Sequence, residues 1–194
     1  MDGFFILDNG NTFYGTLIDG KMNWKGLLYD NDRLIYEGDF VNNNYHGKGK
    51  LFKKNGDIYE GDFENDKYNG KGIEYFKNGE YYEGEFINGK RQGKGVLYYS
   101  NNHPKYNGDF FDDVFEGNGC FYETNGDYYI GEFKNGLKEG KGMEFYKNGD
   151  IKYDGNFSND LYEGKGTFYD EQRNYCEVNF KNGLKHGKGN FYWW

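Results

Sequence analysis

The residue types that usually carry out catalysis are few in this sequence, and its histidines lie far apart. Histidine, cysteine and serine occur only as His46, His103, His186, Cys120, Cys176, Ser100 and Ser158. Nucleophilic catalysis requires a serine or cysteine within hydrogen-bond reach of a base such as histidine. The three histidines lie in different segments and cannot converge, and we expect no serine or cysteine with a partnered histidine. The sequence therefore predicts no enzyme, no catalytic residue and no cofactor-binding or metal-binding residue.

Glycine-rich and acidic motifs are also present, but their spacing does not fit the ligands that such motifs bind. The Gly-Lys-Gly triplets lack the helix and the Ser/Thr spacing of a phosphate-binding loop, so we interpret them as strand glycines. The acidic turns Asp30-Asn31-Asp32 and Asp112-Asp113 lack the spacing of a calcium loop. Asn156-Phe157-Ser158 matches a glycosylation sequon, but we expect it to lie within a strand.

A column of lysines is the one basic feature that could bind a lipid headgroup. It consists of Lys25, Lys48, Lys71, Lys94, Lys141, Lys165 and Lys188. Acidic residues are expected on the same face, at Glu37, Asp39, Glu60, Asp62, Glu83, Glu85 and Glu132. We therefore favour cross-strand ion pairs for these lysines, and headgroup binding is the alternative.

The composition defines the kind of fold that must position these residues. Of 194 residues, 32 are Gly, 21 are Tyr and 18 are Phe, and Ala is absent. A helical fold is excluded because the best helix former is missing and a very poor one is the commonest residue. Disorder is also disfavoured, because disordered chains are poor in aromatic residues and this chain is rich in them. The composition predicts an all-β chain. Its net charge of −8 argues against nucleic acid as a partner.

A short motif recurs along nearly the whole chain. Tyr59-Glu60-Gly61-Asp62-Phe63 is one copy, and related segments start near residues 13, 36, 59, 82, 106, 129, 153 and 176, at steps of 23 or 24. A Gly-x-Gly triplet follows eleven residues after most starts, as at Gly70-Lys71-Gly72. An aromatic residue follows sixteen residues after each start, and an Asn-Gly turn follows in most copies. Asn9-Gly10 marks a preceding half copy.

This pattern resembles the MORN (membrane occupation and recognition nexus) repeat, with eight copies and an N-terminal half copy in a single array over residues 1–194. The resemblance implies an all-β fold, a single-layer antiparallel twisted sheet of stacked β-hairpins that forms an elongated rod. It does not imply one function, because the family includes scaffold proteins of membrane skeletons and cilia and modules attached to enzymes.

The alternation of side chains along a strand predicts the register of each hairpin. Tyr59 and Phe63 should point to one face and Asp62 to the other. Across the hairpin, we expect Asp62 opposite Lys71 and Phe63 opposite Gly70. Gly61 should face Gly72. Large rings would then lie beside bare glycines.

The length of the repeat predicts the loop that joins consecutive hairpins. The period of 23 residues is odd. With two-residue turns alone, equivalent side chains of consecutive copies would therefore point to opposite faces of the sheet. A three-residue loop such as Lys54-Asn55-Gly56, with Gly56 left-handed, restores the parity. We expect this loop in the 23-residue copies and one extra loop residue in the two 24-residue copies.

The aromatic columns and the C-terminal end are the predicted partner sites. A single-layer sheet should leave part of each column exposed, so an extended peptide or an amphipathic helix could lie along an aromatic groove. The predicted contacts are Tyr59, Phe63, Tyr82, Phe86, Tyr129 and Phe133, and at the end Phe191, Tyr192, Trp193 and Trp194. The end either folds back as a cap or mediates a homodimer.

These patterns predict a scaffold that binds proteins, and the alternative is a phospholipid-binding, membrane-tethering module. Cys120 and Cys176 are three copies apart, about 30 Å at ~10 Å per repeat, which is too far for a disulfide. The segment Met1–Asp8 lacks the features of a signal peptide. We therefore expect a cytoplasmic protein, and the family resemblance implies a membrane skeleton, the cytoskeleton or a cilium.

Overall fold

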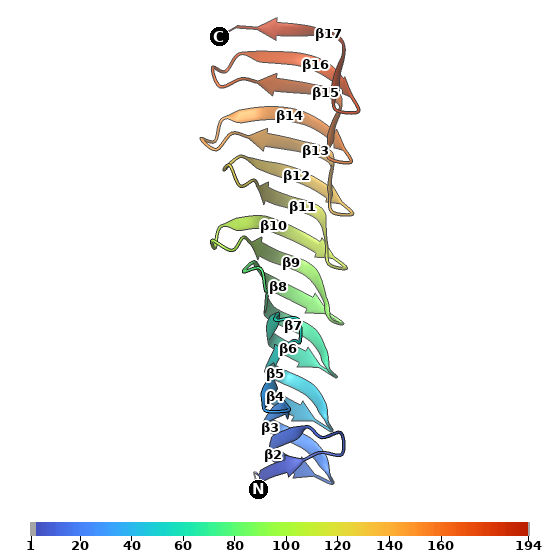
Figure 1. The fold of residues 1–194 in the computed structure, drawn as a ribbon. Coiled ribbons are helices and arrows are strands. Elements are labelled where there is room, and N and C mark those ends of the chain that lie inside the picture. Colours follow the sequence, from blue (N-terminus) through green and yellow to red (C-terminus); the bar gives the residue numbers. More distant parts are fainter. Residues whose placement is uncertain (1–2, 194) are drawn as a thin grey trace. The chain divides into compact units, whose positions relative to one another are not determined.

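The computed structural model describes residues 3–193 and divides into two compact units, residues 1–103 and 104–194. Each unit is a twisted, single-layer sheet of antiparallel strands that pair in chain order (Figure 1). No helix occurs among residues 3–193. The structure thus confirms the prediction of an all-β, single-layer fold built from hairpins.

The first unit contains nine strands, and each pairs with the next along the chain. Their bounds are β1 (Gly3–Ile6), β2 (Thr12–Ile18), β3 (Lys21–Asp30), β4 (Arg33–Val41), β5 (Asn44–Phe52), β6 (Ile58–Glu64), β7 (Lys67–Tyr75), β8 (Tyr81–Ile87) and β9 (Lys90–Tyr98).

The second unit contains eight strands with the same consecutive pairing. Their bounds are β10 (Pro104–Phe111), β11 (Val114–Tyr122), β12 (Tyr128–Lys134), β13 (Leu137–Phe145), β14 (Ile151–Ser158), β15 (Leu161–Tyr169), β16 (Tyr175–Lys181) and β17 (Leu184–Tyr192). Every even-numbered strand from β2 to β16 carries one of the eight repeat starts.

The predicted three-residue loop joins β5 to β6. The Lys53 amide donates to the Asp57 carbonyl at 2.9 Å, and the Gly56 amide donates to the Lys53 carbonyl at 3.2 Å. Gly56 has a φ of +96°, the left-handed conformation that glycine adopts without strain. The prediction of loop Lys54-Asn55-Gly56 is therefore confirmed.

The extra residue of the 24-residue copy that starts at residue 129 is not in its loop. The Tyr146–Asp150 loop has the same two hydrogen bonds, at 2.9 Å each. The register shifts instead within the β13–β14 pair, where Phe145 faces Ile151 and Glu144 faces Tyr153. Lys152 is thus a bulge in the strand, and the prediction of an extra loop residue is wrong here. The copy that starts at residue 13 differs too, because Ile35 is a bulge after a two-residue turn.

A register shift inside each hairpin contradicts the predicted cross-strand pairs. Gly61 faces Gly72 as predicted, but beyond this pair Phe63 faces Tyr68. The turn has two residues in the left-handed region, Asn65 at φ +49° and Asp66 at +67°, which fits a type I′ turn. The second strand therefore accommodates a two-residue bulge, made by the first glycine and the lysine of its Gly-Lys-Gly triplet.

The predictions that Asp62 faces Lys71 and that Phe63 faces Gly70 are therefore wrong. Asp62 instead faces Lys48, and Phe63 faces Gly47, both in the preceding copy. Lys71 in turn faces Glu85 of the following copy. The lysine column and the acidic column still meet, but across repeats rather than within them.

Candidate functional site

Six of the eight copies are closed on one face by a tyrosine ring that lies over two glycines. We call this face, which carries Tyr59 and its equivalents, the Tyr face. A Cβ atom added at Gly61 or Gly72 would overlap the Tyr59 side chain. The Tyr59 hydroxyl donates to the Asp62 carbonyl at 2.9 Å. The glycines thus leave room for a ring whose polar end satisfies a backbone group beside the bulge.

The same contact recurs through both units. The hydroxyl donates to the carbonyl three residues further on, at 2.9–3.1 Å, from Tyr36, Tyr59, Tyr82, Tyr106, Tyr129 and Tyr153. Burial raises the pKa of Tyr36, Tyr59, Tyr106, Tyr129 and Tyr153, because it penalises the phenolate. For Tyr153 the pKa rises to about 12.

The aromatic residues predicted as partner contacts are covered in this structure. The exposed fraction is 0–5% for Tyr59, Phe63, Tyr82, Phe86, Tyr129 and Phe133. Phe63 and Phe86 each pack edge-on against Tyr59 with centroids 5.0 Å apart. The expectation that these columns stay partly exposed is wrong, because neighbouring copies enclose each ring.

A residue nine positions after each start covers the tyrosine from the outside, and the sequence reasoning missed it. Tyr68 stacks on Tyr59 with centroids 3.6 Å apart and planes 7° apart. In another copy, the Lys138 ammonium lies 4.9 Å from the centroid of Tyr129, a cation–π contact. The signal was the recurrence of a ring or a cation at this position, but the predicted register placed it opposite Asn65 at the hairpin tip, away from the tyrosine.

A groove on the Tyr face of the first unit has an apolar floor. Its volume is about 940 Å³, and its apolar lining includes Phe5, Leu17, Met22, Leu28, Ile35 and Tyr45. Polar residues, among them Asp8, Asn43 and Asp66, also line it. An adjoining hollow of about 430 Å³ shares Ile35 and Tyr45. Met22 and Leu28 are buried, whereas Ile35 and Tyr45 are half-buried. We call these two hollows together the Tyr-face groove.

The opposite face of the first unit carries a trough lined by charges of both signs. Its volume is about 850 Å³, and its charged residues are Lys48, Lys50, Lys71, Lys94, Glu37, Glu60, Glu83 and Glu85. The Lys48 ammonium lies 2.7 Å from an Asp62 carboxylate oxygen, and Lys50 lies 2.9 Å from Glu60. The hydrogen bond to Glu60 raises the pKa of Lys50. Cross-strand ion pairing of the lysine column is thus confirmed at Lys48.

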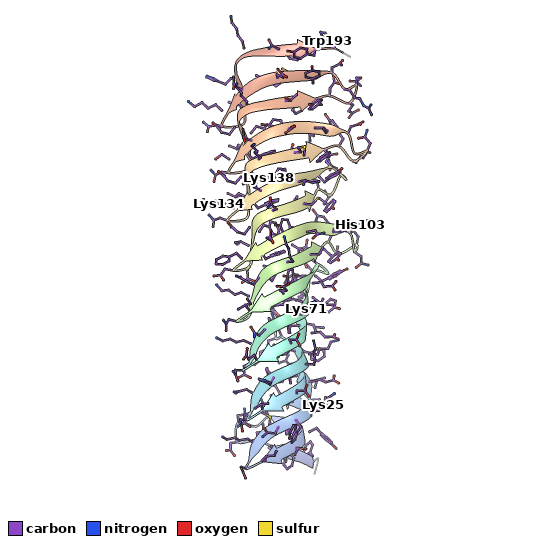
Figure 2. All side chains as sticks on the ribbon, turned by 180° about the vertical axis from the view of Figure 1, so that it is seen from behind. Lys25, Lys71, His103, Lys134, Lys138 and Trp193 are labelled. Atoms are coloured by element: carbon purple, nitrogen blue, oxygen red, sulfur yellow. The ribbon has the colours of Figure 1, made fainter. Side chains whose placement is uncertain are left out.

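In the second unit, the lysine column faces amides instead of carboxylates. Lys141 lies opposite Asn156, and Lys165 lies opposite Asn179. Figure 2 shows Lys25 and Lys71 among the side chains of the first unit.

The C-terminal aromatic residues are largely exposed. The exposed fraction is 64% for Phe191, 39% for Tyr192 and 80% for Trp193, and Figure 2 shows Trp193 at the end of the last strand. The Trp193 ring stacks on Phe191, with centroids 6.5 Å apart. Trp193 therefore does not form the predicted cap, and Trp194 lies outside the described residues.

The three histidines lie in different elements, and Ser100 shares the loop between Tyr99 and His103 with one of them. His46 lies in β5, His186 in β17 and His103 in a loop. Both cysteines are free thiols. Residues 3–193 contain no group of three or more histidine, cysteine or acidic side chains that could hold a metal ion.

Comparison with known families agrees with this geometry. The model of the MORN repeat matches residues 36–58, 59–81, 82–103, 106–128, 129–151, 153–172 and 179–193. The chain belongs to the MORN repeat family. The copy that starts at residue 13 lies outside these matches, although β2 and β3 form its hairpin.

More distant comparisons add no functional argument. A search of curated proteins finds no match. The TCP domain of SAS-4 (dCPAP) from Drosophila melanogaster, in complex with a proline-rich motif of Ana2 (dSTIL), is 10% identical over 98% of this chain and 88% of that chain, with a TM-score of 0.39. An inactive virginiamycin B lyase from Staphylococcus aureus with quinupristin is 13% identical over 98% and 69%, with a TM-score of 0.19.

Proposed function

We propose that this protein is a non-enzymatic scaffold that binds other proteins through the Tyr-face groove. The supporting observation is an apolar floor, with half-buried Ile35 and Tyr45, on a face whose remaining rings are closed by their neighbours. An extended peptide or an amphipathic helix fits such a groove. The buried aromatic columns would then support the faces that bind partners and would not contact a ligand themselves. These columns include Tyr59, Phe63, Tyr82, Phe86, Tyr129 and Phe133.

A pair of matched variants tests the groove. Ile35→Glu places a charge in the groove, whereas Ile87→Glu places the same charge at a site outside it that is 53% exposed. We expect partners captured from the protein's own cells with the full chain to be lost with Ile35→Glu and kept with Ile87→Glu, at equal unfolding midpoints. Identical partner sets for both variants would contradict the proposal.

A phospholipid-binding, membrane-tethering module is the second candidate, supported by the lysine column. The carboxylates that line the same trough weaken this candidate, because anionic lipids attract segments of net positive charge. No helix in residues 3–193 is long and apolar enough to cross a membrane. Strong co-sedimentation with anionic vesicles, lost when Lys71, Lys94 and Lys141 become Glu, would favour this candidate over a scaffold alone.

The assembly that the protein organises is proposed from family membership. We propose a cytoplasmic role at a membrane skeleton, the cytoskeleton or a cilium. A homodimer through Phe191, Tyr192 and Trp193 is part of this proposal, because these residues are exposed. Light scattering of the full chain beside a version ending at Asn190 tests it, and an equal monomeric mass for both would refute it.

A further inference from the structure

The hairpin tips of the second unit carry a row of exposed aliphatic side chains. The first residue of each second strand is Val114, Leu137, Leu161 or Leu184, with exposed fractions of 39%, 38%, 48% and 73%. We call these four residues the aliphatic row. Since Lys138 covers Tyr129 on the Tyr face, the adjacent Leu137 points to the opposite face. The row therefore lies away from the rings of the Tyr face.

The first unit provides an internal control for the aliphatic row. The same position after the turn is occupied there by Lys21, Asn44, Lys67 and Lys90. The cross-strand pairing is identical, since Glu64 faces Lys67 just as Lys134 faces Leu137. Because the hairpin forms equally with lysine or asparagine, folding does not require an aliphatic residue at this position. The tips of the first unit expose Ile18, Val41 and Ile87 instead, on the preceding strand and opposite this position. Aliphatic residues at the start of every second strand are thus particular to the second unit.

The spacing of the row fits an α-helix. Neighbouring members are two strands apart, which is about 10 Å at ~4.8 Å per strand. Seven residues of an α-helix span about 10.5 Å, so every seventh residue of a helix would meet the row. An extended peptide does not match this spacing. A distance of ~10 Å corresponds to three residues of an extended chain, and side chains three residues apart point to opposite faces. The row thus favours a helix with an apolar residue at every seventh position.

The charges beside the row indicate the polar residues of such a helix. Two residues after the first three members, on the same face, are Glu116, Glu139 and Glu163. Each carboxylate accepts a hydrogen bond from the next hairpin turn, from the amides of Asn135, Asn159 and Asn182 at 2.9–3.0 Å. The equivalent residues of the first unit are Asn23, His46, Asn69 and Gln92, which carry no carboxylate.

The other flank of the row is basic at two of its four positions, because Val114 faces Phe111 and Leu161 faces Ser158. Lys134 faces Leu137 across one turn, and Lys181 faces Leu184 across another. Figure 2 shows Lys134 at the margin of its sheet. A helix that fits between these flanks carries basic residues toward the glutamates and acidic residues toward the lysines.

We propose that the aliphatic row of the second unit docks an amphipathic helix of a partner protein. The helix presents Leu, Ile or Val at every seventh position and Lys or Arg along the flank that faces Glu116, Glu139 and Glu163. This site is separate from the Tyr-face groove, and it lies in the other unit. It therefore stands or falls independently of the proposed function.

The test uses a designed helical peptide with four leucines at heptad spacing and lysines along one flank. A control peptide has the same composition, with the leucines distributed around the helix. Fluorescence anisotropy measures the binding of each labelled peptide to the full chain. We expect the designed peptide to bind at least about tenfold more tightly than the control peptide. Equal binding of the two peptides overturns the proposal.

Variants taken from the first unit locate the binding. Leu137→Lys with Leu161→Lys should weaken binding by about tenfold or more, whereas Ile87→Lys should leave it unchanged. Leu137→Asn with Leu161→Asn is the second variant if the lysine pair disturbs folding, which the unfolding midpoint reports. Unchanged binding in both row variants overturns the proposal.

Two further outcomes would assign the row to another occupant. A dimer that becomes monomeric in the row variants by light scattering would make the row an interface between copies of this chain. Loss of binding to phosphatidylcholine–phosphatidylserine vesicles in the same variants, without peptide binding by the wild type, would make it a membrane contact. Either result overturns the helix proposal.

Discussion

At the scale of single residues, the decisive contact is the tyrosine ring that lies over a pair of glycines. The Tyr59 ring occupies the space where side chains at Gly61 and Gly72 would stand. Its hydroxyl satisfies the Asp62 carbonyl at 2.9 Å. A sheet without a second layer thereby encloses an aromatic core, because each ring is covered by its own copy and by the next.

Substitution of Gly72 should therefore cost far more than substitution of its lysine neighbour. Gly72→Ala inserts a methyl group against the Tyr59 ring, which should destabilise the fold by about 1–3 kcal/mol from overpacking, with about 1 kcal/mol more if the hydroxyl loses its carbonyl partner. Lys71→Ala removes an exposed charge and should cost less than ~1 kcal/mol. Urea unfolding of both variants measures the difference. Equal losses would show that the ring does not depend on the glycine.

At the scale of strands and turns, the sequence predicted the hairpins, the Gly61–Gly72 pair and the Lys54-Asn55-Gly56 loop. It failed at the bulge inside each hairpin. Because the bulge has two residues, an even number, it does not change the face to which the following side chains point. The odd period of 23 therefore could not reveal the bulge. The glycine at the bulge was visible in the sequence, but it was interpreted as an ordinary strand glycine.

The error in register had consequences for the candidate site. It placed Tyr68 opposite Asn65, at the tip of the hairpin, rather than opposite Phe63. The rings were thereby left without their outer cover, so Tyr59 and Phe63 were predicted to be partly exposed. The Tyr-face groove was also beyond sequence reasoning, because it depends on Ile35, a bulge residue that interrupts the pairing of β3 with β4.

Turn residues also tie consecutive hairpins together, and this leads to a prediction. The Asp66 carboxylate accepts a hydrogen bond from the Tyr45 amide at 2.7 Å. In the preceding copy, the Asn43 side-chain oxygen accepts one from the Met22 amide, also at 2.7 Å. Asp66→Ala removes this bond and places alanine at a φ of +67°, so it should cost about 1–3 kcal/mol. Asp66→Asn should be nearly neutral. Thermal unfolding compares them, and a similar loss for both would contradict the bonding role of the side chain.

At the scale of the whole molecule, the two units share a repeat but differ in what they expose. The first unit presents the Tyr-face groove and a trough of paired charges. The second presents the aliphatic row beside a line of glutamates. The net charge of −8 favours basic partner segments. One repeat thus supplies several distinct surfaces, which suits a scaffold.

The buried tyrosines also predict the stability of the protein in alkali. An unfolded tyrosine has a pKa of about 10, whereas burial raises the pKa of Tyr153 to about 12. Burial also raises the pKa of Tyr59 above its ordinary value. The folded state therefore keeps protons that the unfolded state releases. This contribution to the free energy of unfolding is complete below about pH 10 and is lost as the pH rises through about 12.

An alkaline titration tests most directly whether rings laid over glycines form the core of this single-layer fold. Phenolate absorbance and circular dichroism are followed together as the pH rises, with a urea-unfolded sample as the reference. We predict that a class of tyrosines ionises only as the β-sheet signal is lost, well above the midpoint of the unfolded reference. Ionisation of every tyrosine near pH ~10, with the β-sheet signal intact, would contradict the buried ring-on-glycine core.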